Sequence, residues 1–167
     1  MTASDAPASS APASARADGH APVSIHAAAV ALGDHAVLLA GPSGAGKSSV
    51  AAGCLALGAG LVADDLCLLH PDEGGLVVSA PPTAPAAIEA RGLGLLPVPL
   101  AGPARAVAIL RLGPAEARLP PPRTERLAGH PLPLLRHPAT PDLPAKVILL
   151  LRAAPFRDPG DPLAAVP

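Results

Sequence analysis

The most informative segment of the chain reads Gly41-Pro42-Ser43-Gly44-Ala45-Gly46-Lys47-Ser48, which matches the phosphate-loop pattern G-x-x-x-x-G-K-[ST]. Glycines let backbone N–H groups converge on an anion, and a helix that begins at Lys47 would add the positive end of its dipole. Lys47 would supply a point charge, and Ser48 would offer a hydroxyl to Mg²⁺. The segment, called the phosphate loop below, predicts a site for nucleotide phosphates. A glycine-rich turn that binds nothing is the alternative interpretation.

The residues around the phosphate loop have the context that the motif needs. Residues 23–32 and 35–40 are apolar runs separated by a turn signal at residues 33 and 34, which predicts a hairpin or two adjacent strands. Residues 47–57 are typical of a small-residue helix that stops near the glycines at 58–60. The order strand, loop, helix is that of an α/β domain.

Two adjacent carboxylates follow the next apolar strand. Residues 61–63 lead directly into Asp64 and Asp65. Phosphoryl transfer needs a carboxylate to help hold Mg²⁺ and often another to accept the proton of the attacking hydroxyl. If this strand is a parallel neighbour of the strand before the phosphate loop, both acids face Lys47 and Ser48. A solvated turn is the alternative.

Charged residues also interrupt the apolar segment 86–98. Glu89 and Arg91 precede Gly92 and Gly94 there. Glu89 could complete a magnesium shell, and Arg91 could steady a phosphate or the acids; an ion pair between the two in a loop is the alternative. His26 lies in the apolar run that leads to the phosphate loop, where its ring could reach a phosphate or could be a hydrogen-bonded core histidine.

The composition excludes several classes of function. Twelve Lys and Arg balance 13 Asp and Glu for a net charge of −1, so no basic field attracts nucleic acid or an anionic membrane. No apolar run approaches the ~20 residues of a membrane helix. With one Phe and no Trp or Tyr, adenine has no aromatic platform, so recognition would rest on phosphates. Cys54 and Cys67 lack zinc-ligand spacing, and a reducing cytoplasm is the expected compartment.

The chain of 167 residues is long enough for one ordinary domain. Residues 1–19 form an Ala/Pro/Ser leader without large side chains, which we predict to be disordered. Residues 20–153 would form the catalytic domain and 154–167 a loose tail. Within the domain, further strands are expected at 66–70, 76–80 and 104–112, and a closing helix near 143–152.

Four segments together resemble a known family. They are Ser24-Ile25-His26, the phosphate loop, the Leu-Val-Ala-Asp-Asp run at 61–65, and the Ile-Glu-Ala-Arg-Gly-Leu-Gly-Leu run at 88–95. In this order and spacing they resemble the C-terminal catalytic domain of HPr kinase/phosphorylase, in the short proteobacterial form without the N-terminal domain. The resemblance implies an α/β fold: a P-loop-containing phosphotransferase domain, similar also to phosphoenolpyruvate carboxykinase, with a mixed sheet and flanking helices.

The resemblance also implies an activity. Members of this family use ATP and Mg²⁺ to phosphorylate a serine of the HPr-type phosphocarrier protein of the phosphotransferase system, and they reverse the reaction by phosphorolysis. Full-length members are hexamers, so a homo-oligomer in the cytoplasm is expected, without a nucleic-acid or membrane partner.

Residue roles follow by position from the same resemblance. Lys47 would hold the β-phosphate, Ser48 and Glu89 the magnesium ion, and Asp65, with Asp64, would be the base toward serine. The catalytic set is then His26, Lys47, Asp64, Asp65 and Arg91. The family's C-terminal catalytic arginine has Arg123 as its stand-in, and Ser49 occupies a position where the family usually has an acid.

Two rival functions share the phosphate loop. A small-metabolite kinase would need a lid and a cluster of polar residues after the second strand, which the sequence does not contain. A nucleotide-binding sensor without phosphotransfer could keep Lys47 and lose the carboxylates. The presence of Asp64, Asp65 and Glu89 favours the kinase over the sensor.

Overall fold

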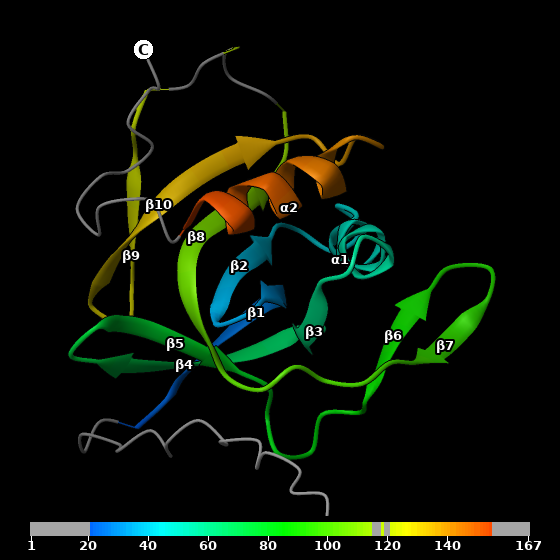
Figure 1. Ribbon diagram of the computed structural model, residues 1–167, viewed down its shortest axis with the longest axis horizontal. Helices are drawn as coiled ribbons and strands as arrows, with labels where there is room; N and C mark the ends of the chain where they lie inside the picture. The colour runs from blue at the N-terminus through cyan, green and yellow to red at the C-terminus, as the bar shows by residue number, and fades with distance from the viewer. Residues whose placement is uncertain (1–20, 115–117, 119–120, 155–167) are drawn as a thin grey trace, which may run out of the picture.

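The computed structural model describes residues 21–114, 118 and 121–154 (Figure 1). The predicted leader at 1–19 and the tail beyond Ala154 lie outside the described residues. The elements in chain order are β1 (Val23–Leu32), β2 (His35–Ala40), α1 (Lys47–Ala56), β3 (Gly60–Ala63), β4 (Leu66–Asp72), β5 (Gly75–Ser79), β6 (Ala87–Ala90), β7 (Gly94–Pro97), β8 (Ala104–Leu112), β9 (Thr124–Leu127), β10 (His130–His137) and α2 (Leu143–Ala153).

The two strands before the phosphate loop form the predicted hairpin. β1 and β2 pair antiparallel from Leu32↔His35 to Ala27↔Ala40. Gly33 makes the turn possible because its φ of 63° is in the left-handed region that glycine enters without a steric penalty. The hairpin delivers the chain from Ala40 directly into the phosphate loop.

Eight strands form one mixed sheet, as expected for an α/β fold. Its order is β2-β1-β4-β5-β8-β10-β9, and β3 adds to β1. β8 pairs parallel with β2 and antiparallel with β5, so the path β2-β1-β4-β5-β8 closes on itself. β6 and β7 form a separate two-stranded hairpin, which projects from the body of the molecule (Figure 1).

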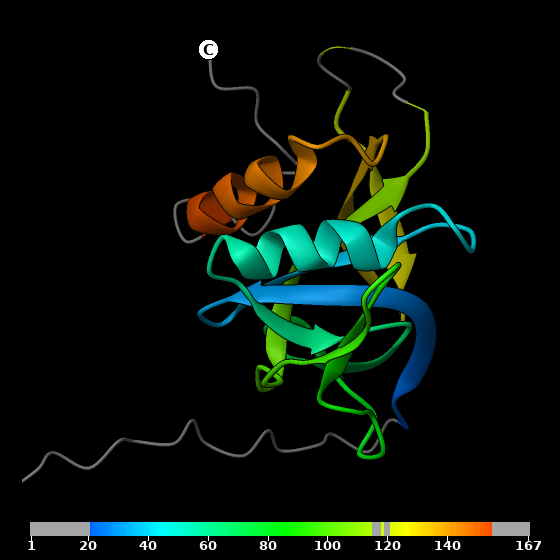
Figure 2. The same cartoon turned by 90° about the vertical axis from the view of Figure 1, so that its right-hand side faces the viewer.

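Both helices of the described chain cover the same face of this sheet (Figure 2). α1 buries Val50, Ala51 and Cys54 there, and α2 buries four apolar residues spaced for one helical face: Leu143, Val147, Ile148 and Leu151. Each fully buried Leu, Ile or Val contributes roughly 1.5–3 kcal/mol relative to exposure. Helix packing therefore fixes the position of the α1 N-terminus, where the phosphate loop ends.

A second core fills the inside of the strand ring. β1 supplies Ala27, Ala29 and Ala31, which alternate with residues that face the helices. Small side chains suit this interior because a ring of few strands leaves little room. Cys67 lies in the same core, where burial first and the charge of Asp64 second raise the pKa of its thiol to about 12, so the thiol stays protonated. Neither helix of the described part is long and apolar enough to cross a bilayer.

Candidate active site

The phosphate loop joins the end of β2 to the start of α1. Gly44 and Gly46 adopt φ values of 80° and 95°, which a side chain would disfavour. The first N–H groups of a helix have no carbonyl partner within it. α1 has neither a side-chain cap nor an acidic residue in its first turn. These N–H groups and the positive end of the helix dipole are therefore available to an anion.

The side chain of Lys47 folds back over the phosphate loop. Its ammonium Nζ donates hydrogen bonds to the carbonyl oxygens of Gly41 and Pro42 at 3.0 and 3.1 Å. These bonds hold the cation at the loop without neutralising it, because its partners are uncharged. A phosphate that enters the loop would meet a positioned positive charge.

Asp64 and Asp65 lie at a kink between two strands that share one edge of β1. β3 pairs with Ala29–Ala31 and β4 with Val23–His26, and both run antiparallel to β1. The expectation that the strands before the loop and before the acids are neighbours is wrong, since β1 lies between them. Ala27 makes the connection: it pairs with Ala40 on one side and its N–H donates to the carbonyl oxygen of Asp65 at 3.1 Å on the other.

The backbone of Asp65 is strained. Its φ of 73° is in the left-handed region, which costs a non-glycine residue roughly 1–2 kcal/mol. Aspartate tolerates this conformation better than most residues, and the bond from Ala27 stabilises it. Strain of this kind occurs preferentially where a side chain must be presented for function. The exposed Asp65 carboxylate is presented beside the phosphate loop.

Asp64 contacts the first turn of α1. The Ser48 hydroxyl donates a hydrogen bond to Asp64 Oδ1 at 3.0 Å. A hydroxyl and a carboxylate oxygen at this distance are hard donors of the kind that Mg²⁺ prefers. No group of three or more His, Cys, Asp or Glu side chains in the described part of the chain could hold a metal by itself. The donor set therefore fits a Mg²⁺ ion that takes its remaining ligands from phosphates and water.

The β6–β7 hairpin brings Glu89 and Arg91 to the same place. Ile88 anchors it in the helix-side core, and the turn between the strands uses Gly92 and Gly94 at φ values of 84° and 101°. A Cβ on Gly44 would lie 4.0 Å from Arg91 Nη2, so the guanidinium reaches the phosphate loop. The alternative of a Glu89–Arg91 ion pair is not realised among the described residues, whose ion pairs lie elsewhere.

These side chains line one cavity of about 340 Å³, called the loop cavity below. Its lining residues are Ser43, Gly44, Gly46, Lys47, Ser48, Ser49, Asp64, Asp65, Glu89 and Arg91. Most of the residues picked from the sequence are thus brought together from three separate segments. Gly41, Pro42 and Ala45 frame the loop without lining the cavity. Ser49 lines it as well, although its only predicted feature is that it follows Ser48 where the family usually has an acid.

Two residues predicted from outside the phosphate loop are also not among those that line the loop cavity. His26 is exposed on β1 and pairs with Leu66, one position from Ala27. Its exposure excludes the core-histidine alternative, and its contact with phosphate stays a prediction. Arg123 is also exposed, just before β9, and its role as the family's arginine likewise stays a prediction.

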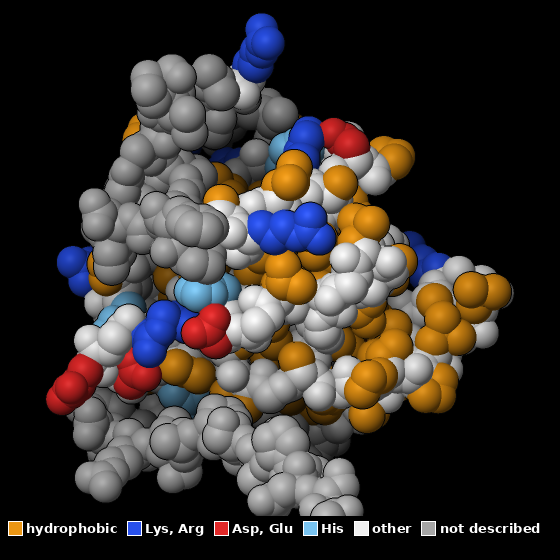
Figure 3. All heavy atoms as spheres, in the orientation of Figure 1, with side chains coloured by type: hydrophobic (Ala, Val, Ile, Leu, Met, Phe, Trp, Pro, Cys, Tyr) orange, Lys and Arg blue, Asp and Glu red, His pale blue; other side chains and the backbone are white. Residues whose placement is uncertain are grey.

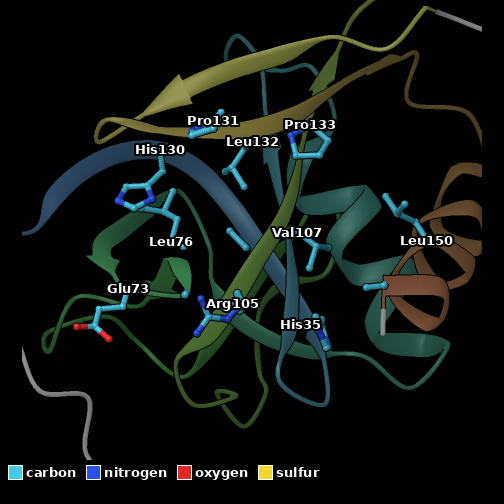
Figure 4. Close-up of a pocket in the computed structure, with 14 residues that line it drawn as sticks. His35, Glu73, Leu76, Arg105, Val107, His130, Pro131, Leu132, Pro133 and Leu150 are labelled. Carbon is cyan, nitrogen blue, oxygen red and sulfur yellow. The ribbon is translucent and has the colours of Figure 1, made fainter. Parts of the chain in front are cut away.

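A second cavity, of about 430 Å³, lies at the other end of β2 and β8 (Figure 4). His35 and Arg105, at the starts of these strands, line it together with Leu76, Val107 and Leu132. It is called the far cavity below. The residues that line it include neither the phosphate loop nor a helix N-terminus.

A phosphate loop between β2 and α1, with acids and an arginine from two further segments around it, defines the class of protein: an α/β phosphate-loop domain. Comparisons with known proteins agree. The family "HPr Serine kinase C-terminal domain" matches residues 20–107. A HPr kinase/phosphorylase from Clostridium tetani is 41% identical over 63 residues, which cover 38% of this chain and 21% of that relative.

A solved structure extends the likeness beyond the family match. The HPr(Ser) kinase/phosphatase from Coxiella burnetii superimposes with a TM-score of 0.69 at 25% identity, over 80% of this chain and 97% of that one. The chain belongs to the HPr serine kinase C-terminal domain family. The matched segment spans about a fifth of the Clostridium relative's length.

Proposed function

We propose that this protein is an ATP- and Mg²⁺-dependent serine kinase whose substrate is an HPr-type phosphocarrier protein. The observation that carries the proposal is the position of Asp65, which is held in a strained kink at the same cavity as Lys47. The family membership and the names of both relatives support the choice of substrate. A nucleotide sensor would have no use for a strained carboxylate at this place.

ATP would bind with its phosphates in the phosphate loop. The N–H groups at the start of α1 and the Lys47 ammonium would contact the β- and γ-phosphate oxygens. None of the described residues that line the loop cavity is a Phe, Trp or Tyr, so the adenine ring would contribute less to affinity than the phosphates.

Ser48, Asp64 and Glu89 would hold Mg²⁺ together with the phosphates. The hydrogen bond between Ser48 and Asp64 orients both oxygens before the ion arrives. The ion would neutralise charge that develops on the phosphate oxygens during transfer.

Asp65 would act as the base toward the substrate. Its carboxylate would accept the proton of a serine hydroxyl as the serine Oγ forms a bond to the γ-phosphorus and the bond to the ADP oxygen breaks. Arg91, which reaches the phosphate loop, would stabilise charge on the transferred group. The reverse phosphorolysis would use the same groups, with Asp65 returning the proton to serine. His26, cytoplasmic location and self-association belong to the proposal as predictions from the family.

The test is direct transfer to the carrier. Purified protein is incubated with Mg²⁺, labelled ATP and the HPr-type carrier of the same genome, and mass spectrometry locates the phosphorylated residue. We expect phosphoserine. Asp65→Asn should lower kcat by about 10²–10⁴-fold while the affinity for ATP stays within roughly twofold.

The matched control is Asp34→Asn, which removes an exposed acid at the far end of β2 and should change neither quantity. Measurable ATP binding with no transfer by the parent protein would replace the kinase proposal with the sensor. Full activity of Asp65→Asn would refute the role of this carboxylate.

A further inference from the structure

The end of the β6–β7 hairpin carries three exposed leucines. Leu93, Leu95 and Leu96 are 77%, 66% and 40% exposed. They are half of the six exposed large hydrophobic residues in the described part of the chain, although they fall within four consecutive positions. Apolar side chains gather on the projecting hairpin at the right of Figure 3. Exposed apolar clusters of this kind mark contact surfaces more often than isolated exposed leucines do.

The pairing of the hairpin connects these leucines to the loop cavity. Glu89 pairs with Leu95, and Ile88 pairs with Leu96. Paired residues on antiparallel strands have side chains on the same face, and successive residues of one strand point to opposite faces. Leu96 therefore lies on the face of the buried Ile88, and Leu95 lies on the opposite face. Leu95 therefore stands beside Glu89, which lines the loop cavity, and Leu93 follows Arg91, which lines it too, with one glycine between them. Leu93 and Leu95 therefore continue the cavity wall outward.

Local packing does not account for the leucines. Ile88 is 2% exposed and anchors the hairpin base in the helix-side core. At the turn, a Cβ added to Gly92 or Gly94 would meet no atom within 4 Å, so this end of the hairpin stands in open space. An isolated two-stranded hairpin gains little stability from exposed leucines. Their position is explained if another surface covers them.

We propose that Leu93 and Leu95, called the leucine face below, are the docking surface for the protein substrate. An apolar patch beside the acceptor serine would pack on the leucine face and place the serine hydroxyl at Asp65. The inference rests on the proposed kinase function. A protein substrate fits best because a small molecule held in the loop cavity would leave the leucines outside it uncovered. The flanking charges, Glu89 and Arg91, have opposite signs, which favours a partner patch that is apolar rather than strongly charged.

The experiment separates docking from chemistry by steady-state kinetics with the carrier and ATP varied in turn. We expect Leu95→Ser to raise KM for the carrier at least tenfold, with kcat and the KM for ATP within about twofold of the parent. The double variant Leu93→Ser/Leu95→Ser should raise the KM for the carrier further. Leu149→Ser is the matched control, because Leu149 is 63% exposed but lies on α2. It should leave all three parameters unchanged.

Each other outcome overturns the inference in a recognisable way. An active parent with an unchanged carrier KM in Leu95→Ser would refute the docking surface and leave the kinase function standing. An altered kcat or ATP KM would place Leu95 in the chemistry through Glu89. A smaller species in sedimentation of Leu95→Ser than of the parent would assign the leucine face to a second copy of this chain. A parent that phosphorylates no carrier would remove the kinase proposal and the inference with it.

Discussion

The two ends of β2 and β8 carry charge in different ways. β2 has six residues, so it spans about 20 Å between the turn at its start and the phosphate loop at its end. At the far end, Arg105 lies 3.1 Å from Asp72 and His35 lies 2.8 Å from Asp34. At the loop end, Lys47 contacts only carbonyl oxygens, and the side chains of Asp65, Glu89 and Arg91 form no ion pair within the described chain.

This difference separates charges that serve the fold from charges that await a ligand. Exposed or half-exposed pairs such as Asp72–Arg105 contribute at most about 1 kcal/mol each, and they are satisfied in the protein alone. Unpaired charges around one cavity contribute nothing to folding, and like charges at Asp64 and Asp65 oppose it. A ligand with phosphates and a divalent cation would satisfy them. Substitutions at the two ends should therefore affect different properties.

The largest effect is expected for Lys47→Ala. The variant removes the only lysine at the loop end, so ATP affinity should fall at least about 100-fold and transfer should become undetectable, because a charge-assisted contact to phosphate is lost. Titration with a fluorescent nucleotide measures this. The chain's other lysine provides the control: Lys146 pairs with Asp142 at 2.7 Å on α2, and Lys146→Ala should bind ATP as the parent does. Unchanged ATP affinity in Lys47→Ala would refute the phosphate-loop assignment.

The next effect concerns backbone shape. Gly46 and Gly58 have nearly equal φ values, 95° and 96°, so an alanine at either position costs about 1–2 kcal/mol of strain. At Gly46 the new Cβ would also lie 2.9 Å from Ala139 Cβ, whereas at Gly58 it meets nothing within 4 Å. We expect Gly46→Ala to lower the stability of the protein more than Gly58→Ala does, and to weaken ATP binding at least tenfold. Gly58→Ala should only lower the melting temperature.

Thermal melts and nucleotide titrations of the two glycine variants provide the comparison. Equal losses of ATP affinity would show that general destabilisation, and not the shape of the phosphate loop, is responsible.

Asp64→Asn should act on the metal alone. The amide can still accept the Ser48 hydrogen bond, but it lacks the charge that attracts Mg²⁺. We expect the Mg²⁺ concentration for half-maximal transfer to rise about tenfold, with ATP binding in the absence of Mg²⁺ unchanged. The same Mg²⁺ dependence as the parent would exclude Asp64 from the metal site. Glu89→Gln is the parallel variant and should shift the Mg²⁺ requirement in the same direction.

Local patterns in the sequence predicted the parts of the site that depend on neighbouring residues. The turn at Gly33, the phosphate loop, α1, β8 and the α2 helix follow from apolar periodicity and glycine placement, and the structure confirms them. The predicted mixed sheet and the predicted family of the chain are confirmed as well.

The rest depends on pairing between distant strands, which periodicity does not encode. β3 and β4 share one edge of β1, so the Asp64–Asp65 kink approaches the loop across Ala27 and not through a parallel neighbour. The sequence does not indicate that Ala27 connects the phosphate loop to Asp65, because its small apolar side chain is typical of any core position. The far cavity depends on where the pairing of β5 and of β10 with β8 ends, and these pairings also join residues distant in the sequence. The exposure of Leu93, Leu95 and Leu96 within the apolar segment 86–98 depends on the projection of the β6–β7 hairpin, which periodicity does not encode either.

The smallest effect is expected at the far cavity, from Asp72→Asn. Partial burial raises the pKa of Asp72, but hydrogen bonds from Arg105 and the Gly74 N–H outweigh burial and lower it below its ordinary value of 3.8. Because the pKa is lowered in the folded state, the stabilising contribution is present above about pH 4 and is lost as the pH falls through the folded pKa. Asp72→Asn should therefore reduce stability at pH 7 by less than about 1 kcal/mol, a few degrees in Tm, and the difference from the parent should shrink toward pH 3. ATP affinity and transfer should not change, since the charges at this end are satisfied within the protein. Thermal melts at several pH values measure the loss of stability in Asp72→Asn, and Glu73→Gln, at the neighbouring exposed acid, is the control. A loss of transfer in Asp72→Asn would show that the two ends of the sheet are coupled.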